Sequence, residues 1–196
     1  MPDYRRLFRA GGTFFFTVVT HNRRGFLCEP LARHCLRSAI EKVRLERPFE
    51  MLAFVLLPEH FHCVWRLPEG DENYSTRMAC IKKDFTKAWL AGGGDEIDIS
   101  RSRRERRERG VWQRRYWEHA IRDQDDLCRH VNYIHYNPVK HDVAECPHLW
   151  PYSTFHRWAE EGYYAKDWLC GCAVSYTHLR AHETSLHLVC RLLLEK

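Results

Sequence analysis

Two apolar segments joined by one short turn place the firmest limit on how this chain can fold. Residues 49–57 and 60–67 are rich in aliphatic and aromatic side chains, and only Pro58 and Glu59 separate them. Strands joined so tightly pair antiparallel, because a parallel pair needs a long crossover connection. The chain must therefore build its sheet around an antiparallel hairpin.

The segment before this hairpin has one strand pattern and one helix pattern. Residues 11–20 follow a Gly-Gly turn and are apolar on both alternations, which predicts a central strand covered on both faces. Apolar residues then recur at helical spacing, which predicts a helix from about 30 to 46. Arg47-Pro48 should end that helix, because the residue before a proline disfavours helical geometry.

The segment after the hairpin again contains helix patterns and one strand pattern. A second helical stripe ends at Trp89, and Ser75 is its expected N-cap. Residues 92–110 are rich in Gly and then in Arg, which predicts a flexible surface loop. Residues 111–121 predict a fourth strand, and Asp123 should cap a third helix. The order β-α-β-β-α-β-α predicts an α+β fold: a ferredoxin-like antiparallel sheet with helices on one face, followed by a C-terminal helix.

The chain of 196 residues has room for one domain and a short appendage. We expect residues 1–171 to form the domain. Residues 172–196 lack Trp and Phe and continue no earlier pattern, so we expect an atypical tail that is disordered or not native to the fold. No apolar run is long enough for a transmembrane helix, and the start lacks the features of a signal peptide.

Nine cysteines are scattered along the chain without a C-x-x-C pair. This pattern argues against a zinc ribbon, and we expect reduced, mostly buried thiols. Cys170 and Cys172 could bind a metal, but one C-G-C pair is weak evidence. His178 and His182 in the tail have the one-turn spacing of metal ligands, although incidental histidines are the simpler interpretation.

The sharpest local motif is His60-Phe61-His62, inside a predicted strand. Alternation along a strand puts both imidazoles on one face and Phe61 on the other. Two neutral imidazoles placed in this way could bind one divalent cation. Taken alone, the motif is better explained as two ordinary strand histidines, so a second feature is needed.

That second feature lies on the third predicted helix. Tyr133 and Asn137 are four residues apart, so they share a helix face, and His130 lies on the same stripe. A tyrosine oxygen beside a metal can attack phosphorus as a nucleophile. Without the histidine pair, Tyr133 is more simply a core or rim tyrosine.

A basic segment carries the whole charge excess of the chain. The chain nets +5, whereas residues 101–115 hold eight Arg and two Glu, which is +6. Arg beside aromatic side chains suits single-stranded nucleic acid, although solvated charge runs are common. The candidate DNA-binding residues are Tyr4, Arg5, Arg6, Lys82, Lys83, Arg104, Arg107, Trp112, Arg114, Arg115, Tyr116 and Trp117.

Together these features resemble one family, the REP-associated tyrosine transposases, a branch of the HUH single-strand transposases. The resemblance runs in order over roughly residues 3–170. The matching stretches are residues 4–6, 11–18, 47–50, 57–65, 67–71, 81–86, 112–122, 133–140 and 150–156. The Arg-rich loop looks longer than the family's usual connection, and the tail does not resemble the family.

The resemblance implies a divalent metal, Mg²⁺ or Mn²⁺, on His60 and His62, with Tyr133 as the catalytic nucleophile. Asn137 matches the position where related enzymes place a third metal ligand. The implied partner is single-stranded DNA with REP hairpins, the short palindromic repeats between bacterial genes. Cutting and joining would pass through a 5′-phosphotyrosine intermediate. The family also implies a cytoplasmic, nucleoid-associated bacterial protein, monomeric in this branch and dimeric among mobile relatives.

Two other functions stay open at this point. A non-catalytic REP-hairpin-binding module or repressor would keep the DNA contacts and drop the chemistry. Such a module has no need of the complete set His60, His62 and Tyr133. A metal-dependent hydrolase of small phosphates would need no stacking aromatics and would show no preference for hairpins.

Overall fold

The computed structural model describes residues 10–106 and 108–170. The expected tail, residues 172–196 with His178 and His182, lies outside the described residues. The described chain falls into two compact units. The first unit holds the residues up to Leu52 and Leu56–Ala120, and the second holds Ala53–Val55 and the residues from Ile121 onward.

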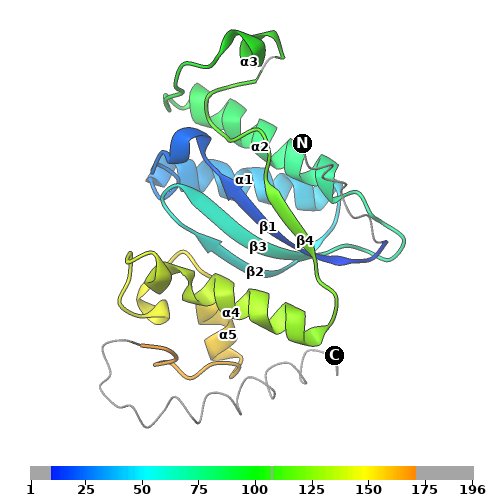
Figure 1. Cartoon of the computed structure of the whole chain (residues 1–196), viewed down its shortest axis with the longest axis vertical. Coiled ribbons are helices and arrows are strands. Elements are labelled where there is room, and N and C mark those ends of the chain that lie inside the picture. Colours follow the sequence, from blue (N-terminus) through cyan, green and yellow to red (C-terminus); the bar gives the residue numbers. More distant parts are fainter. Residues whose placement is uncertain (1–9, 107, 171–196) are drawn as a thin grey trace. The chain divides into compact units, whose positions relative to one another are not determined.

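The strands form one four-stranded antiparallel sheet, ordered β2-β3-β1-β4 (Figure 1). Its strands are β1 (Thr13–Val19), β2 (Glu50–Leu56), β3 (His60–Arg66) and β4 (Trp117–Ala120). The helices α1 (Pro30–Glu46) and α2 (Tyr74–Ala91) lie side by side over one face of this sheet (Figure 1). The predicted ferredoxin-like order is confirmed, including the hairpin of β2 and β3.

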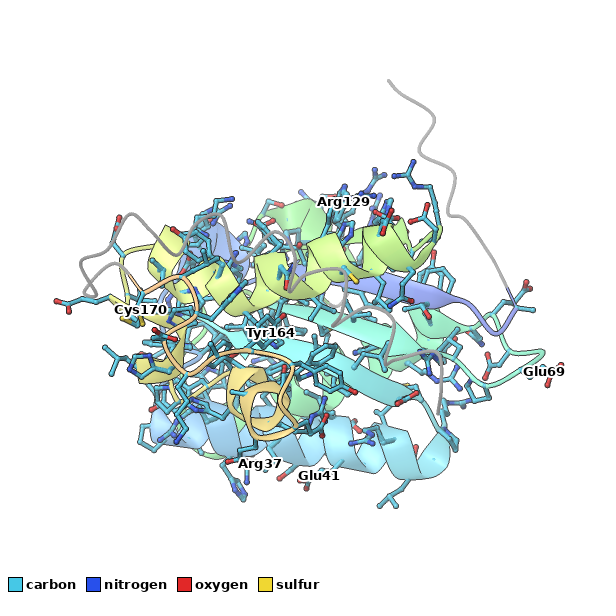
Figure 2. The ribbon with its side chains drawn as sticks, turned by 90° about the horizontal axis from the view of Figure 1, so that it is seen from below. Arg37, Glu41, Glu69, Arg129, Tyr164 and Cys170 are labelled. Carbon is cyan, nitrogen blue, oxygen red and sulfur yellow. The ribbon has the colours of Figure 1, made fainter. Side chains whose placement is uncertain are left out.

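Helix α1 matches its predicted range because both of its ends carry strong sequence signals. Pro30 occupies the first turn, and Arg47, the residue before Pro48, is already non-helical. Arg37 and Glu41 point away from the sheet on the outer side of α1 (Figure 2). The buried stripe of α1 consists of Ala32, Cys35, Leu36, Ala39 and Val43.

The space between the sheet and these helices is filled by aromatic side chains. Phe61 is 1% exposed and lies edge-on to Trp112, with ring centroids 6.0 Å apart. Trp112 also meets Phe85 of α2 at 4.9 Å. Because Phe61 packs into this core, its strand neighbours His60 and His62 face the other side of the sheet, as predicted. The large buried aromatics of this core are Phe14, Phe16, Phe61, Trp65, Tyr74, Phe85 and Trp112.

A buried arginine fixes the loop before α2. Arg77 is 3% exposed and donates to both carboxylate oxygens of Asp71, at 3.1 and 2.5 Å. It also donates to the carbonyls of Arg47 and Pro48, at 3.1 and 2.9 Å. The hydrogen bonds from Arg77 lower the pKa of the Asp71 carboxyl. The loop is therefore tied to the end of α1 through one fully paired cation.

Helix α2 begins earlier than the sequence predicts. The N-cap is Asn73, whose side-chain oxygen accepts the N–H of Thr76 at 3.1 Å, so Ser75 lies within the first turn. The expected loop after α2 contains a short helix, α3 (Arg101–Glu105). An Arg101–Glu105 ion pair of 3.0 Å spans that turn, a pairing that supports helical geometry.

The fourth strand is shorter than predicted. Trp112 makes only an isolated bridge with Thr20, and regular pairing begins at Trp117. The carbonyls of Gln113 and Arg114 instead accept hydrogen bonds from Lys82 Nζ, at 2.7 and 3.4 Å. Lys82 thus donates to two carbonyls that would pair with a neighbouring strand if β4 began earlier.

The second unit contains α4 (Gln124–Lys140), η2 (Pro147–Leu149) and α5 (Phe155–Glu160). Asp123 caps α4 as predicted, accepting the N–H of Asp126 at 2.8 Å. His135 is fully buried between Thr154 Oγ1 at 2.9 Å and Tyr164 Oη at 3.1 Å. Burial lowers the pKa of His135 to about 3, so it stays neutral. Among the helices of the described residues, none has the length and hydropathy needed to cross a bilayer.

Candidate active site and nucleic-acid interface

The two strand histidines converge on one point. His60 and His62 are each 3% exposed, and their Nε2 atoms are 3.1 Å apart. The two rings lie nearly perpendicular, at 80°. Two ring nitrogens are thus aimed at the same small volume on the sheet face opposite α1 and α2.

The far nitrogens of both rings are held by neighbours. Glu59 Oε1 lies 3.0 Å from His60 Nδ1, and Thr17 Oγ1 lies 2.9 Å from His62 Nδ1. A carboxylate only accepts, so it favours the proton on His60 Nδ1 and leaves the Nε2 lone pair available. Carboxylates and hydroxyls behind imidazoles are the usual way in which metal-ligating histidines are oriented.

This donor set fits an octahedral divalent cation. Two adjacent ligands with bonds of about 2.1 Å lie about 3.0 Å apart in such a geometry. The Nε2 separation of 3.1 Å is close to that value. Mg²⁺ and Mn²⁺ usually complete such shells with water and phosphate oxygens, which leaves room for a substrate.

Exposed Trp117 lies on the same sheet face as this histidine pair. Thr17 pairs with His62 on one side and with Trp117 on the other, so the three residues form one row across the sheet. Trp117 is 50% exposed, and its ring lies 5.5 Å from that of Phe15. Neighbouring strands are about 4.8 Å apart, which places Trp117 roughly 10 Å from His62 along the row.

Tyr133 lies on α4 in the second unit, 36% exposed. The Nζ atom of Lys140 donates to its hydroxyl oxygen at 3.5 Å and lies 4.6 Å from the ring centroid. Lys140 was not among the predicted site residues, although it follows Tyr133 by two turns of the same helix.

Asn137 lies one turn after Tyr133 and is fully buried. Among the described residues, neither its Oδ1 nor its Nδ2 atom has a hydrogen-bond partner. Leaving a buried amide without partners costs about 1–3 kcal/mol, so such groups call for an explanation. A ligand that satisfies the oxygen is one such explanation, and the role of Asn137 as a metal ligand stays a prediction.

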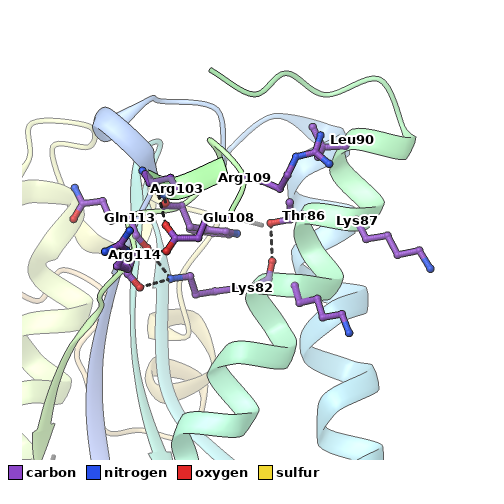
Figure 3. A pocket seen from close by; sticks show the side chains of 11 residues that line it. Lys82, Thr86, Lys87, Leu90, Arg103, Glu108, Arg109, Gln113 and Arg114 are labelled. Carbon is purple, nitrogen blue, oxygen red and sulfur yellow. Dashed lines mark hydrogen bonds and ion pairs between the residues drawn. The ribbon is translucent and has the colours of Figure 1, made fainter. Parts of the chain in front are cut away.

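A basic groove of about 520 Å³ lies between α2 and residues 103–114 (Figure 3). Glu108 is the single acidic side chain in its lining. Thr86 and Gln113 add polar groups, so the lining suits a phosphate backbone. The cationic lining residues are Lys82, Lys83, Lys87, Arg103, Arg109 and Arg114.

Several of these cations are also structural. Lys82 is held by the carbonyls described above, and burial lowers its pKa to about 8. Arg103 donates to Trp112 O at 2.9 Å and pairs with Glu108 at 2.9 Å. Lys83 and Lys87 are exposed. These two side chains are the groove cations best placed to meet an incoming phosphate.

The remaining DNA-binding candidates differ in exposure. Arg104 and Arg114 are exposed and pair with Asp98 at 3.4 Å and Glu108 at 2.8 Å. Arg115 is exposed, and Tyr116 is half-buried with its ring 5.9 Å from that of Phe16. Trp112 is 5% exposed, so in this conformation a base cannot stack on it. The candidates Tyr4, Arg5, Arg6 and Arg107 lie outside the described residues.

The chain is similar to REP-associated tyrosine transposases, although no protein-family model matches it. It is 46% identical over 168 residues to the REP-associated tyrosine transposase of Escherichia coli K12, covering 86% of this chain and 91% of that protein. A relative from Haemophilus influenzae is 42% identical over 169 residues, covering 86% of this chain and 93% of the relative. A solved REP-associated tyrosine transposase bound to a REP hairpin matches with a TM-score of 0.73 and 44% identity, over 90% of this chain and 96% of that one.

Proposed function

Because this chain belongs to the REP-associated tyrosine transposases, we propose that it cuts and rejoins single-stranded DNA carrying REP hairpins. The observation that carries the proposal is the convergence of the His60 and His62 Nε2 atoms, 3.1 Å apart, with both far nitrogens held. A protein that only binds DNA has no use for such a preorganised nitrogen pair. The REP hairpin bound by the solved relative supports the choice of substrate.

Tyr133 is the proposed nucleophile. Its hydroxyl oxygen attacks the scissile phosphorus, the P–O3′ bond breaks, and the DNA keeps a free 3′-hydroxyl while Tyr133 carries the 5′-phosphate. The phenolic proton leaves to solvent, and the departing 3′-oxygen gains one. Attack by a 3′-hydroxyl on the phosphotyrosine reverses these changes and joins strands, so no external energy source is needed.

The histidine pair and Asn137 are the proposed ligands of Mg²⁺ or Mn²⁺. The bound ion would supply Lewis-acid stabilisation of charge on the scissile phosphate. Glu59 and Thr17 keep the imidazoles in the binding orientation, and Glu59 also favours the proton on His60 Nδ1. Lys140 would help to orient Tyr133 through its contact with the hydroxyl oxygen at 3.5 Å.

The basic groove and Trp117 are the proposed DNA-binding elements. Lys83, Lys87 and the surrounding arginines would neutralise phosphates, a contact that carries no sequence information. Trp117 would stack on an unpaired base next to the histidine pair, since any base offers a ring face. Lys82 would act mainly by fixing the chain around Gln113.

A strand-cleavage assay tests this function. The full chain is incubated with a labelled REP-hairpin oligonucleotide and Mn²⁺, with a shuffled-stem oligonucleotide and a chelator as controls. We expect the REP hairpin to be cleaved only when the metal is present. This cleavage should be lost in the His60→Ala, His62→Ala double variant. Tight hairpin binding without cleavage under any divalent metal would instead identify a binding module or repressor.

A further inference from the structure

A cluster of two thiols and one imidazole lies in the second unit and shares no residue with those assigned to DNA cleavage. Cys146, His148 and Cys170 each offer one ligand atom, and these atoms all lie within 4.8 Å of one another. His148 Nδ1 is 3.2 Å from Cys170 Sγ, across 22 residues of sequence. The fold, rather than a local motif, therefore brings the three side chains together.

A tight turn positions the first two members of the cluster. Cys146 is the N-cap of η2, and its carbonyl accepts the N–H of Leu149 at 3.1 Å. The Cys146 side chain is fully buried, whereas His148 is half-buried. One donor is thus fixed in the interior while the second reaches toward solvent.

Aromatic packing positions the third member. Trp168 is 5% exposed, and its ring lies 4.5 Å from that of Tyr164. Leu169 follows with φ of 50°, an uncommon conformation for leucine, and the Cys170 N–H donates to Asp167 O at 3.1 Å. Figure 2 marks Tyr164 and Cys170 in this part of the second unit. Cys170 is therefore placed by a packed segment and a closed turn.

We propose that Cys146, His148 and Cys170 bind one zinc ion. Thiolate and imidazole are the donors that zinc prefers, and in a tetrahedral site neighbouring donors of this kind lie about 3.5–3.8 Å apart. The cluster reaches that geometry with side-chain shifts on the order of 1 Å. Carboxylate-preferring ions such as Mg²⁺ are poor partners for this donor set.

Binding of the ion balances its charge within the cluster. Both thiols release their protons to solvent, and two thiolates with one neutral imidazole offset the two positive charges. Water can fill the fourth position, because His148 and Cys170 are half-exposed. The ion would tie the segment before α5 to the segment after it, a role independent of DNA cleavage.

Cobalt substitution tests this proposal on the full chain. The protein is stripped of metal under reducing conditions and titrated with Co²⁺, whose thiolate charge-transfer band reports sulfur ligands that His60 and His62 cannot supply. We expect the band to saturate at one equivalent and to disappear when Zn²⁺ displaces Co²⁺. The zinc-loaded chain should also unfold at a higher temperature than the stripped chain.

Two half-exposed positions provide variants that should still fold. Cys170→Ser and His148→Gln should each weaken zinc binding by more than about tenfold, since even outer-shell changes reach that size. Cys80→Ser, at a half-buried cysteine of α2, is the matched control and should bind zinc normally. Absence of a thiolate band, a band unchanged in both variants, or a Cys146–Cys170 disulfide in place of zinc binding would overturn the proposal.

Discussion

His62 and Trp117 occupy one row of the sheet, each directly opposite Thr17. Residues opposite one another on neighbouring strands point to the same face. A buried imidazole and a half-exposed indole therefore share one face, separated by a single strand. A nucleotide stacked on Trp117 would lie close to a phosphate bound at the histidine pair.

Replacing Trp117 with Ala should weaken binding of single-stranded DNA. Loss of one stacked base costs about 1–3 kcal/mol, so we expect the dissociation constant to rise by roughly five- to 150-fold. Fluorescence anisotropy with a labelled REP-hairpin oligonucleotide measures this change. Leu45→Ala, which removes an 86% exposed apolar side chain from α1, serves as the control. Equal affinities of the two variants would contradict the stacking role.

Replacing Thr17 with Val should weaken the metal site and leave the fold intact. The variant keeps the shape of the side chain and removes the oxygen that lies 2.9 Å from His62 Nδ1. Loss of such a supporting contact typically costs 10- to 100-fold in metal affinity or activity. The Mn²⁺ concentration needed for half-maximal cleavage should therefore rise. Thr13→Val, on the same strand and face, should behave as wild type, and a similar shift in Thr13→Val would argue against a specific role of Thr17.

Neutralising the exposed lysines of the groove should make DNA binding less sensitive to salt. Each phosphate contact adds about 0.7 to the slope of log affinity against log salt for single strands. Lys83→Gln with Lys87→Gln should therefore reduce that slope by about 1.4. Arg37→Gln with Arg44→Gln removes the same charge from exposed positions of α1 and should leave the slope nearly unchanged. Identical slopes in both double variants would exclude the groove as a phosphate site.

Protonation of His135 should make the second unit sensitive to acid. Burial lowers the pKa of His135 to about 3, against an ordinary value of 6.5 in the unfolded chain. Between these pH values only the unfolded chain binds the proton, so acid favours unfolding. The free energy of unfolding should fall below about pH 6.5 by up to about 1.4 kcal/mol per pH unit. Urea titrations followed by tryptophan fluorescence at several pH values measure this slope.

The control for this pH dependence is a second histidine. His135→Gln should lower stability at neutral pH and flatten its acid dependence, because the titrating group is gone. His34→Gln, at an exposed position of α1, should keep the wild-type slope. An acid dependence that survives in His135→Gln would assign it to other groups.

The periodicity of the sequence was sufficient to predict the fold, because the signals for the strands and α1 are local. The range of α1 followed from the helical spacing of its apolar residues and from Arg47-Pro48, and the opposite orientations of Phe61 and the histidines followed from strand alternation. The start of α2 was wrong because Asn73 and Ser75 are both good caps, and only the structure shows which one accepts the Thr76 N–H.

The supporting residues of the site were harder to predict because they depend on pairing. Thr17 meets His62 only through the register of β1 and β3, across 45 residues. Lys82 looked like a DNA contact, yet its ammonium group is held by the carbonyls of Gln113 and Arg114. Trp112 looked like a stacking residue, yet it fills the core beside Phe61 and Phe85. The residue type alone does not distinguish these roles, whereas the burial of each side chain in the structure does.

The identity of the residue that becomes linked to DNA tests the central claim most directly. Tyr133 and Tyr136 lie on the same helix with nearly equal exposure, 36% and 37%, so Tyr136→Phe is a matched control for Tyr133→Phe. Each variant is incubated with labelled REP-hairpin DNA and Mn²⁺, and the protein–DNA adduct is digested and mapped by mass spectrometry. We predict an adduct on Tyr133 in the wild type and in Tyr136→Phe, and none in Tyr133→Phe. An adduct that persists in Tyr133→Phe would contradict the assignment of Tyr133 as nucleophile.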